Sequence, residues 1–429
     1  MAAVCSAMQF DPLRSAGLAR LAEFLPQAGR FYAQHRNADE GTPASGHARR
    51  NVSQLSPWLH TGILGEAEVL EAVMGAHSPR AAEKFIAEVF WRIYFKGYLE
   101  QRPEIWQAYC AGRDEALAAL EANSGLRRAY SEATEGRTGI AAFDHWSHEL
   151  ANTGYLHNHA RMWFASIWIF TLKLDWRLGA DFFLRHLVDG DAASNTLSWR
   201  WVAGLHTKGK HYLARADNIA RYTAAHPQGP LSAEGLIEDA DPIEEAAQFA
   251  RRQLDLPAQV TAYDLAQPFA LLLHDEAAHH APLDLPSSPA LVIGAERAAA
   301  RSPALAAPIA QRFAQGAVVQ GMKEASAHYG CAAQMWDDAG SLAQILAERG
   351  ITRIAVPYLP AGWTRDALWP AIEPLARQGR VITLLPEISR VTWPLAKAGF
   401  FAVAKNIEAV LGQCGITGSG APSSGGSAG

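Results

Sequence analysis

The chain has 429 residues, which is enough for two or three domains of ordinary size. Hydrophobic residues make up 49%, charged residues 19% and the net charge is −5, which excludes a disordered chain and a histone-like polycation. The four cysteines (Cys5, Cys110, Cys331 and Cys414) form no CxxC pair, which argues against a zinc ribbon and a disulfide framework. No apolar run reaches the roughly 18 residues of a membrane span, and we expect a soluble cytoplasmic protein with no membrane partner.

The first half of the chain is expected to be helical. Long proline-free segments at 81–101 and 159–175 carry apolar residues at three- and four-residue spacing, as amphipathic helices do. Glycine and proline mark the breaks between such segments. We therefore predict a mainly α-helical domain over 1–230, followed at 231–264 by an acidic linker that leads into a short helix.

The second half changes to alternating strand and helix patterns. Short apolar runs of strand type occur at 269–274, 290–295, 353–359 and 380–386, separated by Ala-rich helical stretches. This alternation predicts an α/β Rossmann-like domain over 265–412, built on a parallel sheet. Neither GxGxxG nor GxxxxGK[ST] is present, so the sequence gives little support for a nucleotide there. The Gly/Ser-rich end, 413–429, is expected to be a disordered tail.

Several polar side chains between 136 and 201 are embedded in a strongly apolar helical background. They are Asn158, Arg161, Asp189, Asp191 and Asn195. Buried groups of this kind are costly unless they are paired or bind something polar. A salt bridge between Arg161 and Asp189 would account for part of the set. A helical pocket holding a large aromatic cofactor with amide-like edges would account for the whole set.

A basic strip follows this stretch. Between 196 and 225, one acidic residue, Asp217, accompanies five basic ones: Arg200, Lys208, Lys210, Arg215 and Arg221. Charge alone favours an ordinary solvated helix face, and a phosphate-binding surface is the alternative.

The run HDEAAHH (274–280) contains side chains that can ligate metals. A polar run after a strand is more typical of a solvated loop, so we expect no metal site.

Six segments together resemble the DNA photolyases and cryptochromes. They are SQLSPWLHTGILG (53–65), FIAEVFWRIYF (85–95), GRTGIAAFD (136–144), TGYLHNHARM (153–162), LDWRLGADFF (174–183) and DGDAASNTLSWRW (189–201). The resemblance covers about 50–225 and implies a photolyase-type FAD-binding fold for the helical domain. In that family the α/β domain comes first, so the order here is predicted to be permuted.

The resemblance implies FAD as the cofactor, active in its reduced form. Ser53, Leu55 and Ser56 would contact its phosphates. The residues expected around the flavin are Phe85, Glu88, Arg92, Asn158, Arg161, Asp189, Asp191 and Asn195. Asn195 would face N5 of the flavin, and an asparagine there favours repair over signalling. The resemblance leaves open an antenna chromophore, which no motif identifies.

The implied partner is UV-damaged DNA. The substrate-binding residues would be Trp91, Asn158, His159, Met162, Trp201, Lys208 and Lys210, with Glu88 hydrogen-bonded to a thymine carbonyl. Trp199 and Trp176 match the first two members of the family's electron-transfer chain. The residues implied as catalytic are Glu88, Asn195, Trp199 and Trp176. The outer member of the chain falls near Ala133, and the candidates to replace it are Tyr130, Trp146, Trp163 and Trp168.

The leading hypothesis is a light-driven photolyase, a carbon–carbon lyase that splits cyclobutane pyrimidine dimers. Asn158 followed by His159 lacks the His-His pair of (6-4) photolyases, which favours the cyclobutane substrate. The alternatives are a (6-4) photolyase, a cryptochrome-like photoreceptor, and a nucleic-acid-binding module without flavin. We expect a monomer without an iron–sulfur cluster, since only Cys5 and Cys110 lie in the helical domain.

Overall fold

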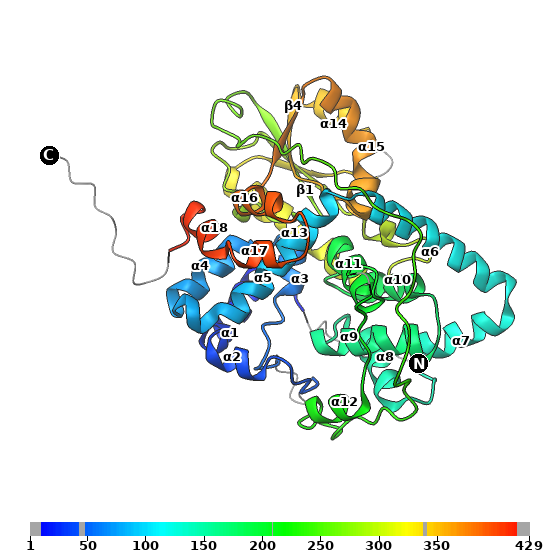
Figure 1. The fold of residues 1–429 in the computed structure, drawn as a ribbon. Helices are drawn as coiled ribbons and strands as arrows, with labels where there is room; N and C mark the ends of the chain where they lie inside the picture. The colour runs from blue at the N-terminus through cyan, green and yellow to red at the C-terminus, as the bar shows by residue number, and fades with distance from the viewer. Residues whose placement is uncertain (1–9, 43–47, 208, 338–340, 418–429) are drawn as a thin grey trace, which may run out of the picture.

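The computed structural model describes residues 10–42, 48–207, 209–337 and 341–417. The first half is helical, as predicted (Figure 1). Its helices are α1 (Arg14–Phe24), α2 (Arg30–His35), α3 (Ser56–His60), α4 (Glu66–Ala76), α5 (Pro79–Glu100), α6 (Glu104–Ala122), α7 (Ser124–Thr134), α8 (Ala141–Thr153), α9 (Asn158–Ser166), α10 (Trp176–His186), α11 (Ala192–Val202) and α12 (Ala216–Tyr222). The two segments with helical periodicity coincide with α5 and with α9 and its π-helical extension Ile167–Thr171.

The second half contains a parallel sheet, also as predicted, and the sheet has five strands. Its strands are β1 (Phe269–His274), β2 (Leu291–Ala295), β3 (Ala332–Met335), β4 (Arg353–Pro357) and β5 (Val381–Leu384), in the order β3-β2-β1-β4-β5. The four apolar runs correspond to four of these strands. The sequence did not reveal β3, because this edge strand is largely exposed and its residues, AAQM, form no apolar run.

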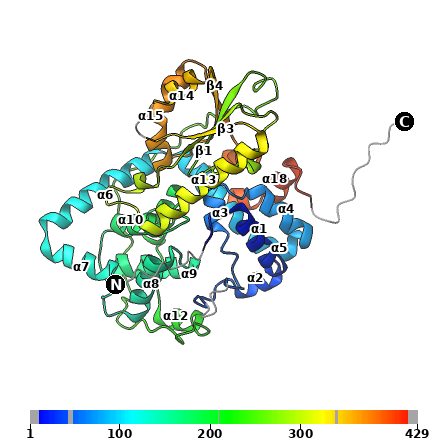
Figure 2. The same ribbon diagram turned by 180° about the vertical axis from the view of Figure 1, so that it is seen from behind.

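Helices cover both faces of the sheet (Figures 1 and 2). They are α13 (Pro308–Tyr329) on one face, and α14 (Leu342–Glu348) and α15 (Trp363–Arg377) on the other. Alternate residues of β1 enter separate hydrophobic clusters. Ala270 and Leu272 pack with residues of α14 and α15, whereas Leu271 and Leu273 pack with Ala325 of α13. The two-residue period of a strand thus supplies apolar side chains to both layers.

The acidic linker differs from the prediction in one respect. Residues 231–264 form turns and extended chain, so the short helix predicted there is wrong. The backbone of this segment forms hydrogen bonds with the helical half: Ile243 N donates to Ala203 O, and Arg252 N donates to Gln101 O. Glu245 also forms an ion pair with Arg200 of α11 at 2.6 Å.

The last part of the described chain returns to the helical half. It contains α16 (Glu387–Thr392), α17 (Phe401–Ala404) and α18 (Ile407–Gln413), which lie beside α4 and α5 in Figure 1. Their apolar side chains share one core with α1, α4 and α5. Of the predicted tail, 413–417 is described, and 418–429 lies outside the described residues.

The carboxyl edge of the sheet faces the helical half. Ala278, just after β1, donates its N–H to Thr61 O, and a Cβ on Gly62 would lie 2.8 Å from Glu276 O. Glycine is therefore required at position 62, where φ is +62° and two backbones meet. Among the helices within the described ranges, none combines the length and apolar character needed to cross a membrane.

Candidate functional site

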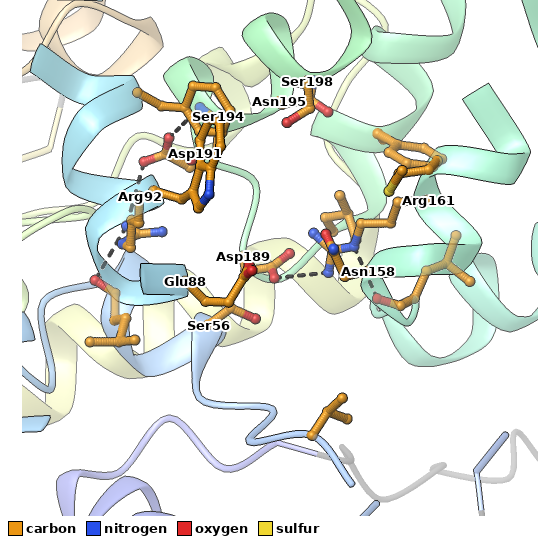
Figure 3. Close-up of a pocket in the computed structure, with 18 of the residues that line it drawn as sticks. Ser56, Glu88, Arg92, Asn158, Arg161, Asp189, Asp191, Ser194, Asn195 and Ser198 are labelled. Atoms are coloured by element: carbon orange, nitrogen blue, oxygen red, sulfur yellow. Dashed lines mark hydrogen bonds and ion pairs between the residues drawn. The ribbon is translucent and has the colours of Figure 1, made fainter. Parts of the chain in front are cut away.

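A cavity of about 560 Å³ opens between α5, α9 and α11, a volume in the range of small-molecule and cofactor sites. Figure 3 shows Arg92 and Arg161 on opposite walls, with Asp189 between them and Asp191 beside Arg92. The structure brings most of the predicted site residues together here. Those that line the cavity are Ser53, Ser56, Phe85, Glu88, Trp91, Arg92, Asn158, Arg161, Met162, Asp189, Asp191, Asn195, Trp199 and Trp201.

The loop before α11 directs its two aspartates to different partners. Asp189 accepts a hydrogen bond from Arg161 at 2.9 Å, the salt bridge considered from the sequence. Asp191 is the N-cap of α11 and accepts from Ser194 N at 2.7 Å. Its Oδ2 lies 3.4 Å from both Arg92 Nη2 and Lys96 Nζ.

Buried cations set the charge of these carboxylates. Burial by itself would raise the pKa of Asp191, but Lys96 and Arg92 overcome it and hold that pKa well below its ordinary value. The pKa of Asp189 is likewise lowered, because Arg161 outweighs the burial. Burial lowers the pKa of His60, whose Nδ1 lies 3.7 Å from Asp191, so this imidazole is neutral near pH 7. Both aspartates are therefore ionised beside the cavity.

Asn195 has a fixed orientation. Its Nδ2 donates to Ala180 O at 2.8 Å, and within the described ranges its Oδ1 accepts no hydrogen bond from the protein. The amide oxygen therefore remains available to an N–H group of a ligand in the cavity. Apolar walls with a few fixed polar groups such as this one are typical of cofactor sites, and the residues fit a flavin.

Arg36, which sequence reasoning did not single out, approaches Glu88. Its Nη1 lies 2.5 Å from Glu88 Oε1, and both side chains line the cavity. The two residues are 52 positions apart: Arg36 follows the last residue of α2, and Glu88 lies in α5. No local spacing in the sequence could have paired them.

Aromatic side chains form one part of the cavity wall. The ring of Trp91 stacks on that of Phe400 with centroids 4.0 Å apart and an angle of 15°. Trp201 is 37% exposed and stacks on Tyr212 at 5.8 Å. Phe400 is a second residue that sequence reasoning missed, since it lies in the chain far from every segment of the motif.

Some predicted residues do not line the cavity. Leu55 is fully buried beside it, and Trp176 is buried in the core next to Tyr109. His159 stacks on Trp163 and contacts Asn37 O at 3.0 Å. The predicted lysines do not contribute to the lining either: Lys210 is exposed outside the cavity, and Lys208 lies outside the described residues.

Trp199 connects the cavity to a row of rings. Its centroid lies 6.3 Å from that of Trp168, which lies 6.0 Å from that of Tyr130. A Cβ on Gly179 would come within 2.3 Å of Trp199, so glycine is needed where these indoles pack on α10. Trp176 contacts Tyr109 instead, at 5.9 Å.

Two residues of the α/β half donate hydrogen bonds to the loop Leu187–Asp191, which borders the cavity. The guanidinium of Arg301, which is fully buried, donates to Leu187 O at 2.7 Å. Trp363 Nε1, at the start of α15, donates to Gly190 O at 3.3 Å. The cavity loop is thus positioned by residues more than a hundred positions away in the chain.

An ion pair crosses the same boundary. Lys96 Nζ lies 2.7 Å from Glu276 Oε2 and 3.4 Å from Asp191 Oδ2. His60, Asp191 and Glu276 bring potential metal ligands within 4.8 Å of one another, but the ammonium of Lys96 already pairs with both carboxylates, and Arg92 pairs with Asp191.

Within the described ranges, Glu276 is the one residue of the run HDEAAHH that joins a group of potential metal ligands, with His60 and Asp191. His274 contacts Pro357 O at 3.2 Å, whereas His279 pairs with Glu324 at 2.7 Å. His274 and His279 therefore have separate partners, and the ring of His279 stacks on that of His280 at 4.7 Å.

The comparisons with known proteins support the interpretation of the cavity as a cofactor site. Residues 85–230 match the family model of the FAD binding domain of DNA photolyase. Deoxyribodipyrimidine photo-lyase of Streptomyces griseus is 32% identical over 225 residues, covering 47% of this chain and 48% of that protein. The Synechococcus protein of the same name is 30% identical over 257 residues, covering 52% and 49%.

Similar structures have also been solved. A bacterial class III photolyase from Agrobacterium tumefaciens matches with a TM-score of 0.40 and 26% identity, covering 49% of this chain and 42% of that chain. A Synechocystis cryptochrome matches with a TM-score of 0.39 and 25% identity, covering 49% and 43%.

The helical half contains the residues that match the FAD binding domain of DNA photolyase, and a parallel α/β sheet packs against this half. Over residues 85–230 the chain is similar to the DNA photolyases, and the relatives it matches carry that name. The chain spans about half the length of the curated relatives it matches.

Proposed function

We propose that this protein is a light-driven DNA photolyase that uses reduced FAD to split cyclobutane pyrimidine dimers. One observation carries the proposal: polar groups suited to a flavin and aromatic groups suited to unstacked pyrimidines line the same cavity. The relatives named deoxyribodipyrimidine photo-lyase support the same activity. When bound, reduced FAD would supply the light-driven electron transfer that opens the cyclobutane ring.

The proposed flavin contacts come from three parts of the cavity. Ser53 and Ser56 would bind the phosphates, with Leu55 contributing through its backbone. The amide oxygen of Asn195 would accept the hydrogen on N5 of the flavin. The remaining contacts would be made by Phe85, Glu88, Arg92, Asn158, Arg161, Asp189 and Asp191.

The lesion would enter beside the flavin. Trp91 and Trp201 would stack on the two pyrimidines, which must first leave the duplex. Glu88 would hydrogen-bond the thymine ring, and Arg36 beside it would donate to a carbonyl oxygen. The further substrate contacts would be Asn158, His159, Met162, Lys208 and Lys210.

Light-driven reduction of the flavin requires an electron path to the surface. Trp199 would be its first member. The ring spacings favour Trp168 and Tyr130 as the next members, since they continue from Trp199 at 6.3 and 6.0 Å. Trp176, implied by the resemblance, would form a second branch through Tyr109.

The proposed organisation is a helical domain (1–230), a linker (231–264) and an α/β domain (265–412), in permuted order relative to the family. The α/β half would stabilise the flavin domain, because Arg301, Trp363 and Glu276 all contact it.

The test is repair of a thymine cyclobutane dimer in an oligonucleotide by the reduced, flavin-loaded protein, with and without blue light. We expect light-dependent restoration of normal thymines and no repair in the dark. A matched oligonucleotide with a (6-4) lesion is the specificity control. Photoreduction without repair of either lesion would refute the proposal and favour a photoreceptor.

A further inference from the structure

A C-terminal segment, Lys397–Lys405, runs along α5 next to the aromatic wall of the cavity. Side chains of α5 and the residues just after it fasten its start: Tyr94 Oη donates to Ala398 O at 2.8 Å, and Arg102 Nη2 donates to Lys397 O at 2.6 Å. Gln101 Nε2 holds the preceding turn through Trp393 O at 2.9 Å. The backbone of this segment therefore has a defined position beside the site.

Two consecutive phenylalanines in the segment differ in burial. Phe400 stacks on the ring of Trp91 at 4.0 Å, so it backs a residue that lines the cavity. Phe401 is 77% exposed. A phenylalanine this exposed contributes little to the hydrophobic core, and it follows directly after the ring that stacks on Trp91. The chain thus places an exposed ring one residue after the ring that stacks on Trp91.

The positive charge of the segment favours binding of a polyanion. Lys397 and Lys405 are exposed, and no acidic residue lies between them in the sequence. The ammonium of Lys405 lies 5.8 Å from the centroid of the Phe401 ring. Exposed aromatic rings interleaved with lysines are the features that bind single-stranded nucleic acid, through base stacking and phosphate contacts.

We infer that Lys397–Lys405 is a second DNA-contact surface, which binds the lesion-bearing strand beside the cavity. Phe401 stacks on an unpaired base next to the lesion, Lys397 and Lys405 contact phosphates, and Phe400 keeps Trp91 in its stacking orientation. This inference rests on the proposed function. It adds a contact that lies outside the segments shared with the photolyases, about 200 residues after the last of them.

The experiment measures binding of a fluorescent oligonucleotide with one thymine dimer, by anisotropy, to the full-length flavin-loaded protein. Phe401→Ala is expected to weaken binding about fivefold or more, the loss of one stacked base. The double change Lys397→Ala and Lys405→Ala is expected to reduce the slope of log affinity against log salt concentration by about one to two in magnitude.

Matched controls come from outside this surface. Tyr263→Ala removes another exposed ring, 88% exposed, before β1 at the sheet edge that faces away from the helical half. Lys323→Ala removes an exposed lysine on α13. The helix α13 faces the viewer in Figure 2, whereas α17 faces the viewer in Figure 1, so the two helices lie on opposite sides of the protein. Both controls should bind the oligonucleotide as the wild-type protein does.

The outcomes separate this inference from the proposed function. If the wild-type protein shows no preference for damaged DNA, the proposed function fails and this surface fails with it. If the wild-type protein prefers damaged DNA, but the Phe401 and lysine variants match it or lose no more than their controls, this surface is refuted alone. Because Phe401 lies outside the cavity lining, its variant should retain wild-type flavin content and thermal stability.

Discussion

The substitution Lys96→Met tests the ion pair between the two halves of the protein. The ammonium of Lys96 lies 2.7 Å from Glu276 and 3.4 Å from Asp191, and both carboxylates are nearly inaccessible. Methionine keeps the length of the side chain and removes its charge. Asp191 retains Arg92, but Glu276 loses the partner that lowers its pKa. Stranding one member of a buried pair typically costs about 3–5 kcal/mol, and we expect a loss in that range at pH 8.

The sign of the pH dependence follows from linkage. In the wild-type protein Lys96 outweighs burial and lowers the pKa of Glu276, so this stabilisation is present above the ordinary glutamate pKa and is lost on acidification. Without Lys96, burial raises the pKa of Glu276, which becomes protonated in the folded state as the pH falls. The destabilisation by Lys96→Met should therefore be larger at pH 8 than at pH 5.

Urea denaturation followed by tryptophan fluorescence at pH 5 and pH 8 measures both effects. The control is Lys84→Met on the same helix, where the lysine is exposed and its pair with Glu83 contributes less than about 1 kcal/mol. The double variant Lys96→Met, Glu276→Gln should recover much of the loss, since it leaves no stranded carboxylate. If Lys96→Met behaves like Lys84→Met, or its effect does not depend on pH, the reasoning is refuted.

The remaining predictions concern the flavin. Arg301→Met should weaken FAD binding about tenfold in a fluorescence titration, because the loop Leu187–Asp191 loses a hydrogen bond of about 1.4 kcal/mol from a charged donor; unchanged affinity would exclude this positioning role. Asn195→Asp should lower the midpoint potential of bound FAD by adding negative charge near N5, and an unchanged spectrochemical titration would contradict the assigned position. Trp199→Phe should slow photoreduction while chemically reduced enzyme still repairs DNA. Trp168→Phe should slow photoreduction more than Trp176→Phe in flash photolysis, and the reverse order would place the main path through Trp176.

Local sequence patterns determined a large part of the secondary structure of this protein. The helical periodicity of α5 and α9 and the apolar runs of four strands could be predicted because their signals lie within a few turns or a few residues. Most of the motif residues likewise line one cavity, and the sequence offers the pairing of Arg161 with Asp189 as one interpretation. Two errors have a common cause. The helix expected in the acidic linker does not form, and the sequence did not predict β3. Contacts with distant segments decide both structures.

Only the tertiary structure decided how the two halves support the site. Glu276 reaches Lys96 across 180 positions, and Phe400 stacks on a tryptophan of α5 from the far end of the chain. Arg301 likewise binds the cavity loop across 114 positions. A sequence pattern carries information about neighbours on one helix or strand, whose spacing is set by backbone geometry. Partners this far apart meet only after the helices and the sheet have packed, so no spacing along the chain encodes them.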